Sequence, residues 1–190
     1  MAASGRRDQE REEEGLAVSL DPMRRRHLRS VLRIESKVYP RPWSLSLFMS
    51  ELALRVNRSY TVARVGGEVV GYSGLMLALD EGHVTTIAVD PEWHRNHIGT
   101  RLMLDIARCS RRRGVRHLTL EVRVSNRGAQ ALYHGFGFAP EGIRHNYYTE
   151  TSEDAIVMWA HDIDTREYEE RLADIEARIG GTTLVPKDRW

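Results

Sequence analysis

The chain has 190 residues, and its 28 Lys and Arg residues nearly balance its 27 Asp and Glu residues, giving a formal net charge of +1 at pH 7. This length suits one compact domain with its own core and is short for two. The small net charge gives no reason to expect direct binding to nucleic acid. No apolar run approaches the roughly 20 residues that span a bilayer, and the N-terminus lacks the apolar segment of a secretory signal. We therefore expect a cytoplasmic protein without membrane contacts.

Neither a disulfide framework nor a metal centre is predicted. Cys109 is the only cysteine, which excludes an intrachain disulfide and fits a reducing compartment. Its place in a helical run favours a small buried apolar residue over a nucleophile. His94 and His97 are three residues apart, but no third ligand of suitable spacing accompanies them, so we expect no bound metal.

The N-terminal third predicts a charged tail and two helices. Residues 1–19 form the tail, which is too polar to build a core and is expected to be disordered. Asp21-Pro22 offers an N-cap and a first-turn proline for the first helix. The aromatic loop Tyr39–Trp43 interrupts the helical pattern, and Ser44 can cap the second helix.

The middle of the chain alternates strand and helix signals. Gly66-Gly67 is a hairpin turn signature between two strand patterns, and Gly114 ends a long helix that begins at Ile98. The expected strands cover residues 60–65, 68–78, 83–89, 118–122 and 155–160, with one more after 138, and a further helix covers 126–135. This order indicates a single α/β or α+β domain with a mixed sheet.

The C-terminal residues 164–190 predict an amphipathic helix and a short tail. Apolar residues recur at helical spacing among Glu and Arg: Tyr168, Leu172, Ile175 and Ile179. Packing of this stripe on the domain is favoured, and a homodimer or partner contact is the alternative.

The stretch Val89–Leu104, VDPEWHRNHIGTRLML, predicts an anion-binding site. A strand ends in an Asp-Pro turn, a basic loop follows, and a long amphipathic helix begins. Free backbone N–H groups at a helix start, together with the positive end of its dipole, favour anionic oxygens. Arg95 and Arg101 add positive charge close by. A diphosphate is a fitting ligand for such a place.

A second group of residues occurs in Leu120–Phe138, LEVRVSNRGAQALYHGFGF. A strand delivers Glu121, a turn passes Asn126, and a helix presents Tyr133. An acid within an otherwise apolar strand needs a partner or a water-lined cleft. From the pattern alone, Glu121 could equally lie on a solvated face, and Tyr133 could pack its ring on the sheet.

Four stretches together resemble the GNAT acyltransferases, and among them the N-terminal acetyltransferases that modify ribosomal proteins at alanine. They are YPRPWS (Tyr39–Ser44), IAVDPEWHRNHIGTRLM (Ile87–Met103), LEVRVSNRGAQALYHGFGF (Leu120–Phe138) and RHNYYTETSEDAIVM (Arg144–Met158). They occur in family order and spacing, so the resemblance covers about residues 20–163. It implies a GNAT domain whose central sheet is mixed, mostly antiparallel and flanked by helices. In the coenzyme loop, Gly99 matches the family's second glycine and His97 replaces its first.

The resemblance implies direct acetyl transfer from acetyl-CoA to a peptide's α-amine. Glu121 corresponds to the family's general base and Tyr133 to its general acid. The backbone of Ile87, Ala88 and Val89 would receive the pantetheine arm and the thioester carbonyl. The other residues expected to contact the coenzyme are Arg95, Asn96, His97, Ile98, Gly99, Thr100 and Asn126. The residues expected to line the peptide entrance are Tyr39, Trp43, Tyr147 and Tyr148.

The acceptor is expected to be the exposed N-terminus of a ribosomal protein that begins with alanine or another small residue. Attack requires a neutral amine, and the reference pKa of an α-amine is about 7.7–8.0, against about 10.4 for lysine. The alternatives are a GNAT enzyme acting on a small amine or a lysine side chain, and a coenzyme A-binding module without turnover. His97 in the coenzyme loop motivates the second of these.

Overall fold

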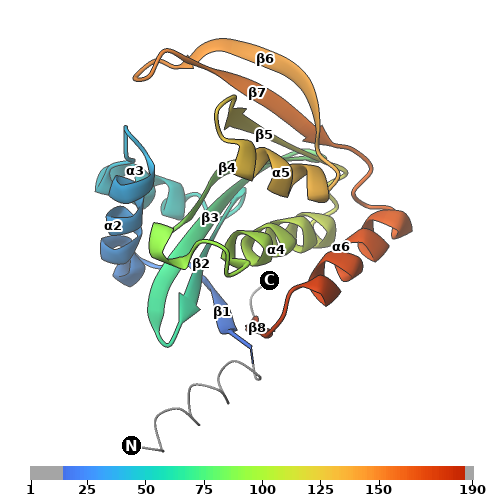
Figure 1. Cartoon of the computed structure of the whole chain (residues 1–190), viewed down its shortest axis with the longest axis horizontal. Coiled ribbons are helices and arrows are strands. Elements are labelled where there is room, and N and C mark those ends of the chain that lie inside the picture. Colours follow the sequence, from blue (N-terminus) through green and yellow to red (C-terminus); the bar gives the residue numbers. More distant parts are fainter. Residues whose placement is uncertain (1–14, 187–190) are drawn as a thin grey trace, which may run out of the picture.

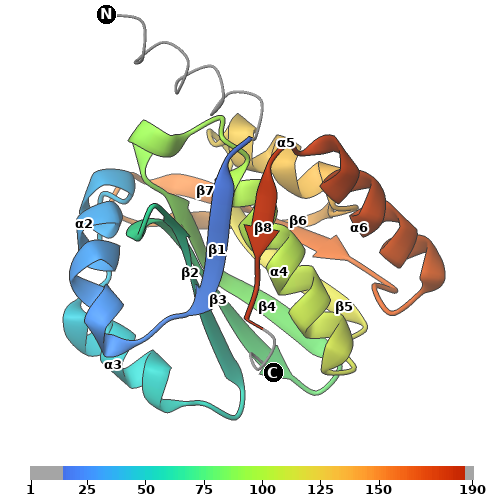
Figure 2. The ribbon, with the colours of Figure 1, turned by 90° about the horizontal axis from the view of Figure 1, so that it is seen from below.

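The computed structural model describes residues 15–186, which form an eight-stranded sheet with helices on both faces (Figures 1 and 2). The strand order is β6-β7-β5-β4-β3-β2-β1-β8, and neighbours pair antiparallel except in the parallel pairs β4–β5 and β1–β8. The strands are β1 (Ala17–Pro22), β2 (Arg58–Val65), β3 (Glu68–Ala78), β4 (Glu81–Val89), β5 (His117–Arg123), β6 (Ala139–Tyr148), β7 (Glu153–Ala160) and β8 (Thr182–Leu184). The helices are α2 (Leu28–Val38), α3 (Leu45–Ala53), α4 (Ile98–Arg112), α5 (Arg127–Gly135) and α6 (Arg166–Arg178), with short 3-10 helices η1 (Arg25–His27) and η2 (Pro91–Trp93). This mixed, mostly antiparallel sheet confirms the predicted fold class.

Two apolar layers lie on opposite faces of the central strands. Successive side chains of a strand point to opposite faces, and neighbouring residues of β2 accordingly join different clusters. Val62 packs with Phe48 of α3 and with residues of α2, whereas Ala63 packs with Leu102 of α4. Helices α2 and α3 therefore cover one face and α4 covers the other. No helix among the described residues has the length and apolarity needed to cross a membrane.

The prediction of a helix N-cap at Asp21-Pro22 is wrong, because both residues belong to β1. Val18 and Leu20 are buried, so the apolar period here is two and not the helical 3.6. β1 pairs with β2. The strand is short and has charged neighbours, so its alternating pattern is hard to recognise in the sequence. The strand begins at Ala17, within the stretch assigned to the tail, while residues 1–14 of that tail lie outside the described residues.

Local capping and turn signals of the sequence are confirmed. The Ser44 hydroxyl accepts a hydrogen bond from the Leu47 N–H at 3.2 Å and caps α3. Gly66 and Gly67 have φ angles of 56° and 88°, the left-handed geometry that a tight hairpin turn between β2 and β3 requires. Gly114 follows α4 with a φ of 76°, as expected for a helix C-terminus.

The C-terminal stripe packs onto the domain. Its residues join the apolar cluster that also contains Phe136 and Phe138: Tyr168, Leu172, Ile175 and Ile179. Arg108 of α4 donates two hydrogen bonds to Glu176 of α6, at 2.9 and 2.6 Å. β8 then pairs with β1 at the far edge of the sheet, a strand that the sequence pattern does not predict.

The parallel pair β4–β5 opens into a fork. The two strands pair only from Glu81 to His83 on β4 and from His117 to Thr119 on β5. Beyond these residues β4 stays paired with β3, and β5 stays paired with β7. The strands therefore diverge and expose their facing edges to the space between them.

Candidate active site

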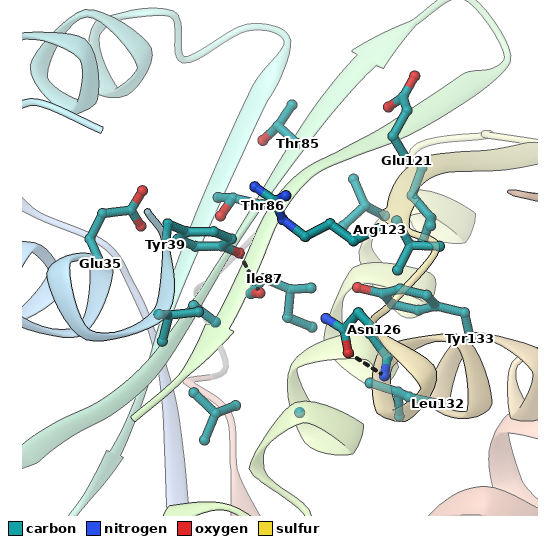
Figure 3. Close-up of a pocket in the computed structure, with 18 of the residues that line it drawn as sticks. Glu35, Tyr39, Thr85, Thr86, Ile87, Glu121, Arg123, Asn126, Leu132 and Tyr133 are labelled. Atoms are coloured by element: carbon teal, nitrogen blue, oxygen red, sulfur yellow. Dashed lines mark hydrogen bonds between the residues drawn. The ribbon is translucent and has the colours of Figure 1, made fainter. Parts of the chain in front are cut away.

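The fork between β4 and β5 opens into a cleft of about 1040 Å³ (Figure 3). Its walls come from α2 and the loop after it, from β4, from the start of α4, from β5 and α5, and from the end of β6. The predicted residues that line it are Tyr39, Trp43, Ile87, Ala88, Val89, Arg95, His97, Ile98, Gly99, Thr100, Glu121, Asn126, Tyr133, Tyr147 and Tyr148. Four stretches that are distant in the sequence thus meet in one cavity.

Two residues predicted or suspected near the anion site have other surroundings. Asn96 does not line the cleft, and its side-chain amide donates to the carbonyls of Trp93 and His94 at 3.3 and 3.1 Å. Arg101 is 2% exposed and donates to Thr183 and to the Gly180 carbonyl. Arg101 therefore anchors the C-terminal segment, and the expectation that its charge supports the anion site is wrong.

The start of α4 has the geometry of an anion site. His97 is its N-cap and adopts the left-handed conformation, with a φ of 57°, and within residues 15–186 its side chain does not cap the helix. The first-turn N–H groups are therefore left for an anionic ligand. A Cβ on Gly99 would meet its nearest neighbour, Leu132, at 3.5 Å, which is ordinary contact. The demanding positions of this loop are thus Arg95, with a φ of 66°, and His97, and histidine is among the residues that tolerate a positive φ.

The exposed edge of β4 presents backbone groups to the cleft. The Tyr39 hydroxyl donates to the Ile87 carbonyl at 2.9 Å, and a His94 ring nitrogen lies 3.2 Å from the Val89 carbonyl. Both carbonyls therefore point away from β3. Since the N–H and C=O of one strand residue point to the same side, the N–H groups of Ile87 and Val89 face the cleft as well. Burial raises the pKa of Tyr39 to about 12, so this donor stays protonated.

Glu121 is a partnered carboxylate at the β5 side of the cleft. Its side chain is 10% exposed, and Oε2 lies 2.6 Å from Nε2 of His83 on β4. Its other oxygen, Oε1, lies 3.1 Å from Nε of Arg144 on β6. The hydrogen bond from His83 holds the pKa of Glu121 below its usual value, with help from Arg144 and against the effect of burial. Glu121 is therefore ionised at neutral pH and is no solvated surface acid.

Tyr133 extends from α5 toward the same cleft, on the other side from Tyr39 (Figure 3). The residue is 5% exposed, and its ring packs on Phe138 with the centroids 5.9 Å apart. Burial raises the pKa of its phenol, and the neighbouring Tyr39 and Tyr148 add to the increase. The hydroxyl thus remains a proton-bearing donor throughout the physiological range.

The end of β6 contributes two aromatic side chains to the cleft. The rings of Tyr147 and Tyr148 lie edge to face with centroids 5.1 Å apart. Arg123 stacks 3.8 Å above the Tyr148 ring, and the Tyr148 hydroxyl donates to the Glu121 carbonyl at 3.4 Å. Tyr147 is 46% exposed and is therefore available to a ligand.

Asn126 combines the two roles considered for it. Its side-chain oxygen accepts a hydrogen bond from the Ala129 N–H at 3.1 Å and caps α5. The residue also lines the cleft (Figure 3). The cap fixes the side chain, so its amide nitrogen has a defined direction at the cleft surface.

Sequence reasoning missed a buried acid on α2. Glu35 is 2% exposed, and its Oε1 accepts a hydrogen bond from the Trp43 N–H at 2.9 Å. Its Oε2 has no hydrogen-bond partner among residues 15–186. Burial raises the pKa of Glu35 to about 7, although the bond from Trp43 opposes the shift. Through this bond, Glu35 fixes the loop that carries the predicted acceptor wall.

Sequence reasoning also missed His83, for which a signal exists. Glu121 and His83 are the ionisable residues of the predicted strands 118–122 and 83–89. Only the parallel pairing of β4 with β5, however, brings them together, because His83 lies opposite Thr119, two residues before Glu121. The strand pairing could not be read from either strand alone.

Comparison with known proteins agrees with this geometry. The model of the acetyltransferase (GNAT) family matches residues 28–138. The chain is 37% identical over 134 residues to ribosomal protein bS18-alanine N-acetyltransferase of Escherichia coli, covering 69% of this chain and 88% of that one. It is 40% identical over 121 residues to N-alpha-acetyltransferase RimI of Mycobacterium tuberculosis, covering 62% and 74%. The crystal structure of the ribosomal-protein-S18-alanine N-acetyltransferase from Escherichia coli superposes with a TM-score of 0.70 at 32% identity, covering 76% of this chain and 94% of that one.

The match includes β4, the α4 loop, β5 and α5, which together carry most of the cleft, and extends over most of the length of the relatives. The chain therefore belongs to the acetyltransferase (GNAT) family and is an acetyl-CoA-dependent N-acetyltransferase.

Proposed function

We propose that the protein acetylates the N-terminal α-amine of ribosomal protein bS18, or of a ribosomal protein that likewise begins with alanine or another small residue. The observation that carries this proposal is the joint presence, in one cleft, of the carboxylate Glu121, the phenol Tyr133 and the aromatic pair Tyr147-Tyr148. The names of the relatives from Escherichia coli support the same acceptor.

The coenzyme fits the side of the cleft formed by α4 and β4. Its pyrophosphate would bind at the start of α4, where first-turn N–H groups are uncapped and Arg95 lies close by. The N–H groups of Ile87 and Val89 would hold the pantetheine arm and the acetyl carbonyl. Such backbone donors are preset, so they stabilise a developing oxyanion without reorganisation.

The proton transfers of the reaction require ionisable side chains, which lie around Glu121 and Tyr133. An α-ammonium must lose a proton at the Glu121 side before its nitrogen can bond to the acetyl carbonyl carbon. The C–S bond then breaks with its electron pair on sulfur. Tyr133 is a protonated donor, so it can hydrogen-bond that sulfur and supply its proton. Of the two protons that the nitrogen loses in total, one ends on sulfur and one in solvent.

The aromatic residues suit an extended peptide end. Tyr39 and Trp43 form one wall of the entrance, and Tyr147 and Tyr148 form the other. The Tyr39 hydroxyl is tied to the β4 backbone at 2.9 Å, which restricts the space beside the acetyl position. We expect a small first side chain at this site, as in the alanine that the relative from Escherichia coli modifies.

A peptide assay tests the proposal. The protein is incubated with acetyl-CoA and lysine-containing peptides that begin with alanine, with a bulky residue, or with an already acetylated alanine, and product masses are measured. We expect one added acetyl group on the free alanine peptide, little on the bulky one and none on the blocked one. Glu121→Gln and Tyr133→Phe should each lower kcat by about 10²–10³-fold with unchanged acetyl-CoA affinity. Acetylation of the blocked peptide would instead identify lysine as the acceptor.

A further inference from the structure

His83 occupies the vertex of the fork, at the last residue where β4 pairs with β5. Its strand partner is Thr119, and its Nε2 lies 2.6 Å from Oε2 of Glu121. The His83 side chain is 28% exposed and that of Glu121 only 10%, and both residues line the cleft. Of the two groups, the imidazole is thus the one more open to an incoming amine or to a water molecule.

Both carboxylate oxygens of Glu121 are already engaged. His83 lies against Oε2, and Arg144 lies 3.1 Å from Oε1. In the part of the chain that the structure describes, Nδ1 of His83 makes no hydrogen bond of its own. A carboxylate that accepts from Nε2–H fixes the neutral ring in the tautomer whose lone pair is on Nδ1. The pair therefore presents a basic nitrogen, with the carboxylate behind it.

We propose that His83 is the proton acceptor of the reaction and that Glu121 is the positioning residue that orients it. This inference rests on the proposed function. One N–H bond of the peptide's α-ammonium breaks, the electron pair stays on nitrogen as the nucleophile, and the proton bonds to Nδ1, directly or through one water. Glu121 stabilises the imidazolium until the proton passes to solvent.

The reference pKa values of the three groups favour an imidazole over a carboxylate as the proton acceptor. An α-ammonium has a reference pKa of about 7.7–8.0, a carboxyl group about 4.3 and an imidazole about 6.5. Proton transfer is therefore uphill by more than about 10³-fold to a carboxylate and by roughly 10- to 30-fold to an imidazole. His83 and Arg144 make the Glu121 carboxylate a weaker base still.

Other titratable and charged groups lie near the pair. The groups that face the pair from β6 are Arg144, on the far oxygen of Glu121, and Tyr147. Arg58 lines the same cleft but is paired with Glu51 at 2.7 Å. The positive charge of Arg144 offsets part of the charge of the Glu121 carboxylate.

Kinetics of matched variants test the roles. His83→Gln keeps a donor for Glu121 but cannot take up a proton, and kcat/KM for the alanine peptide should fall about 10²-fold or more with unchanged acetyl-CoA binding. His83→Gln combined with Glu121→Gln should be no slower than the slower single variant, because the pair acts as one unit. Added imidazole should restore activity to His83→Gly. The control is His161→Gln, the same replacement in a similar pair with Glu141 at 2.7 Å outside the cleft, and it should keep full activity.

The tautomer of His83 provides a measurement without turnover. Ring ¹⁵N NMR of the wild-type protein at high pH should show the proton on Nε2, and Glu121→Gln should weaken this preference. A proton on Nδ1, or wild-type kcat/KM in His83→Gln while Glu121→Gln is impaired, would overturn the assignment and leave the proposed function intact. Absence of acetylated peptide from the wild-type protein would instead overturn the proposed function, and the NMR result would still decide the state of the pair.

Discussion

At the scale of single residues, Glu35 shows how the cleft wall couples stability to pH. The residue is 2% exposed, and burial raises its pKa to about 7 from 4.5. Between these two pH values the folded protein holds a proton on Glu35 that the unfolded chain has released. Stability therefore falls as pH rises from 4.5 to 7, by up to about 3 kcal/mol from this group, and the loss is complete above pH 7.

Glu35→Gln should remove this pH dependence, since glutamine keeps an acceptor for the Trp43 N–H but does not ionise. Urea unfolding at pH 5 and pH 8 should show the variant gaining stability relative to wild type at the higher pH. Glu68→Gln is the control, because Glu68 is exposed and paired with Arg33. Parallel pH curves for wild type and Glu35→Gln would show that Glu35 ionises as an ordinary surface acid.

At the scale of elements, the N-cap residue of α4 carries backbone strain. His97 has a φ of 57°, which costs about 1–2 kcal/mol for an L-residue and more for a β-branched one. Glycine removes this strain, but it also increases the conformational entropy of the unfolded chain, which lowers the free energy of unfolding by about 0.4–1 kcal/mol. His97→Gly should therefore change the free energy of unfolding by less than about 1 kcal/mol, while His97→Val should lower it by more than about 1 kcal/mol.

The affinity of the His97 variants for acetyl-CoA is the functional counterpart of this stability prediction. If backbone N–H groups of the first turn bind the pyrophosphate, His97→Gly should keep the acetyl-CoA Kd within about threefold of wild type, or about 0.7 kcal/mol. Calorimetric titration measures this directly. A tenfold loss of affinity would show that the imidazole itself binds the coenzyme.

At the scale of the whole molecule, the sequence predicts what depends on neighbouring residues and misses what depends on distant pairing. The cap at Ser44 and the turn at Gly66-Gly67 are local, so their residues suffice. β1 and β8 are short, and only their positions beside β2 and beside each other define them as strands. The contact between His83 and Glu121 likewise requires the β4–β5 pairing. Glu121 and Tyr133, in contrast, are predicted as site residues from the resemblance of their sequence stretch to the family.

The C-terminal segment is held to the domain by contacts that span the whole chain. Leu172 is fully buried in the cluster that includes residues of α4 and β5. Arg101 of α4 donates to Gly180, just before β8, and to Thr183 within β8. α6 and β8 should therefore unfold together with the sheet. Leu172→Ala should lower the free energy of unfolding by about 2–5 kcal/mol, whereas Glu170→Ala, at an exposed position of the same helix, should change it by less than about 0.5 kcal/mol.

Two probes of the same unfolding transition distinguish an integral segment from an appendage. Tryptophan fluorescence in a Trp190→Phe background follows Trp43, Trp93 and Trp159, which lie in the body of the domain. Far-ultraviolet circular dichroism follows all the helices. In Leu172→Ala both signals should shift together to lower urea, because loss of packing under α6 destabilises the shared core. If the helical signal alone moved and the tryptophan transition stayed in place, α6 would be an independent element docked on a domain that is stable without it.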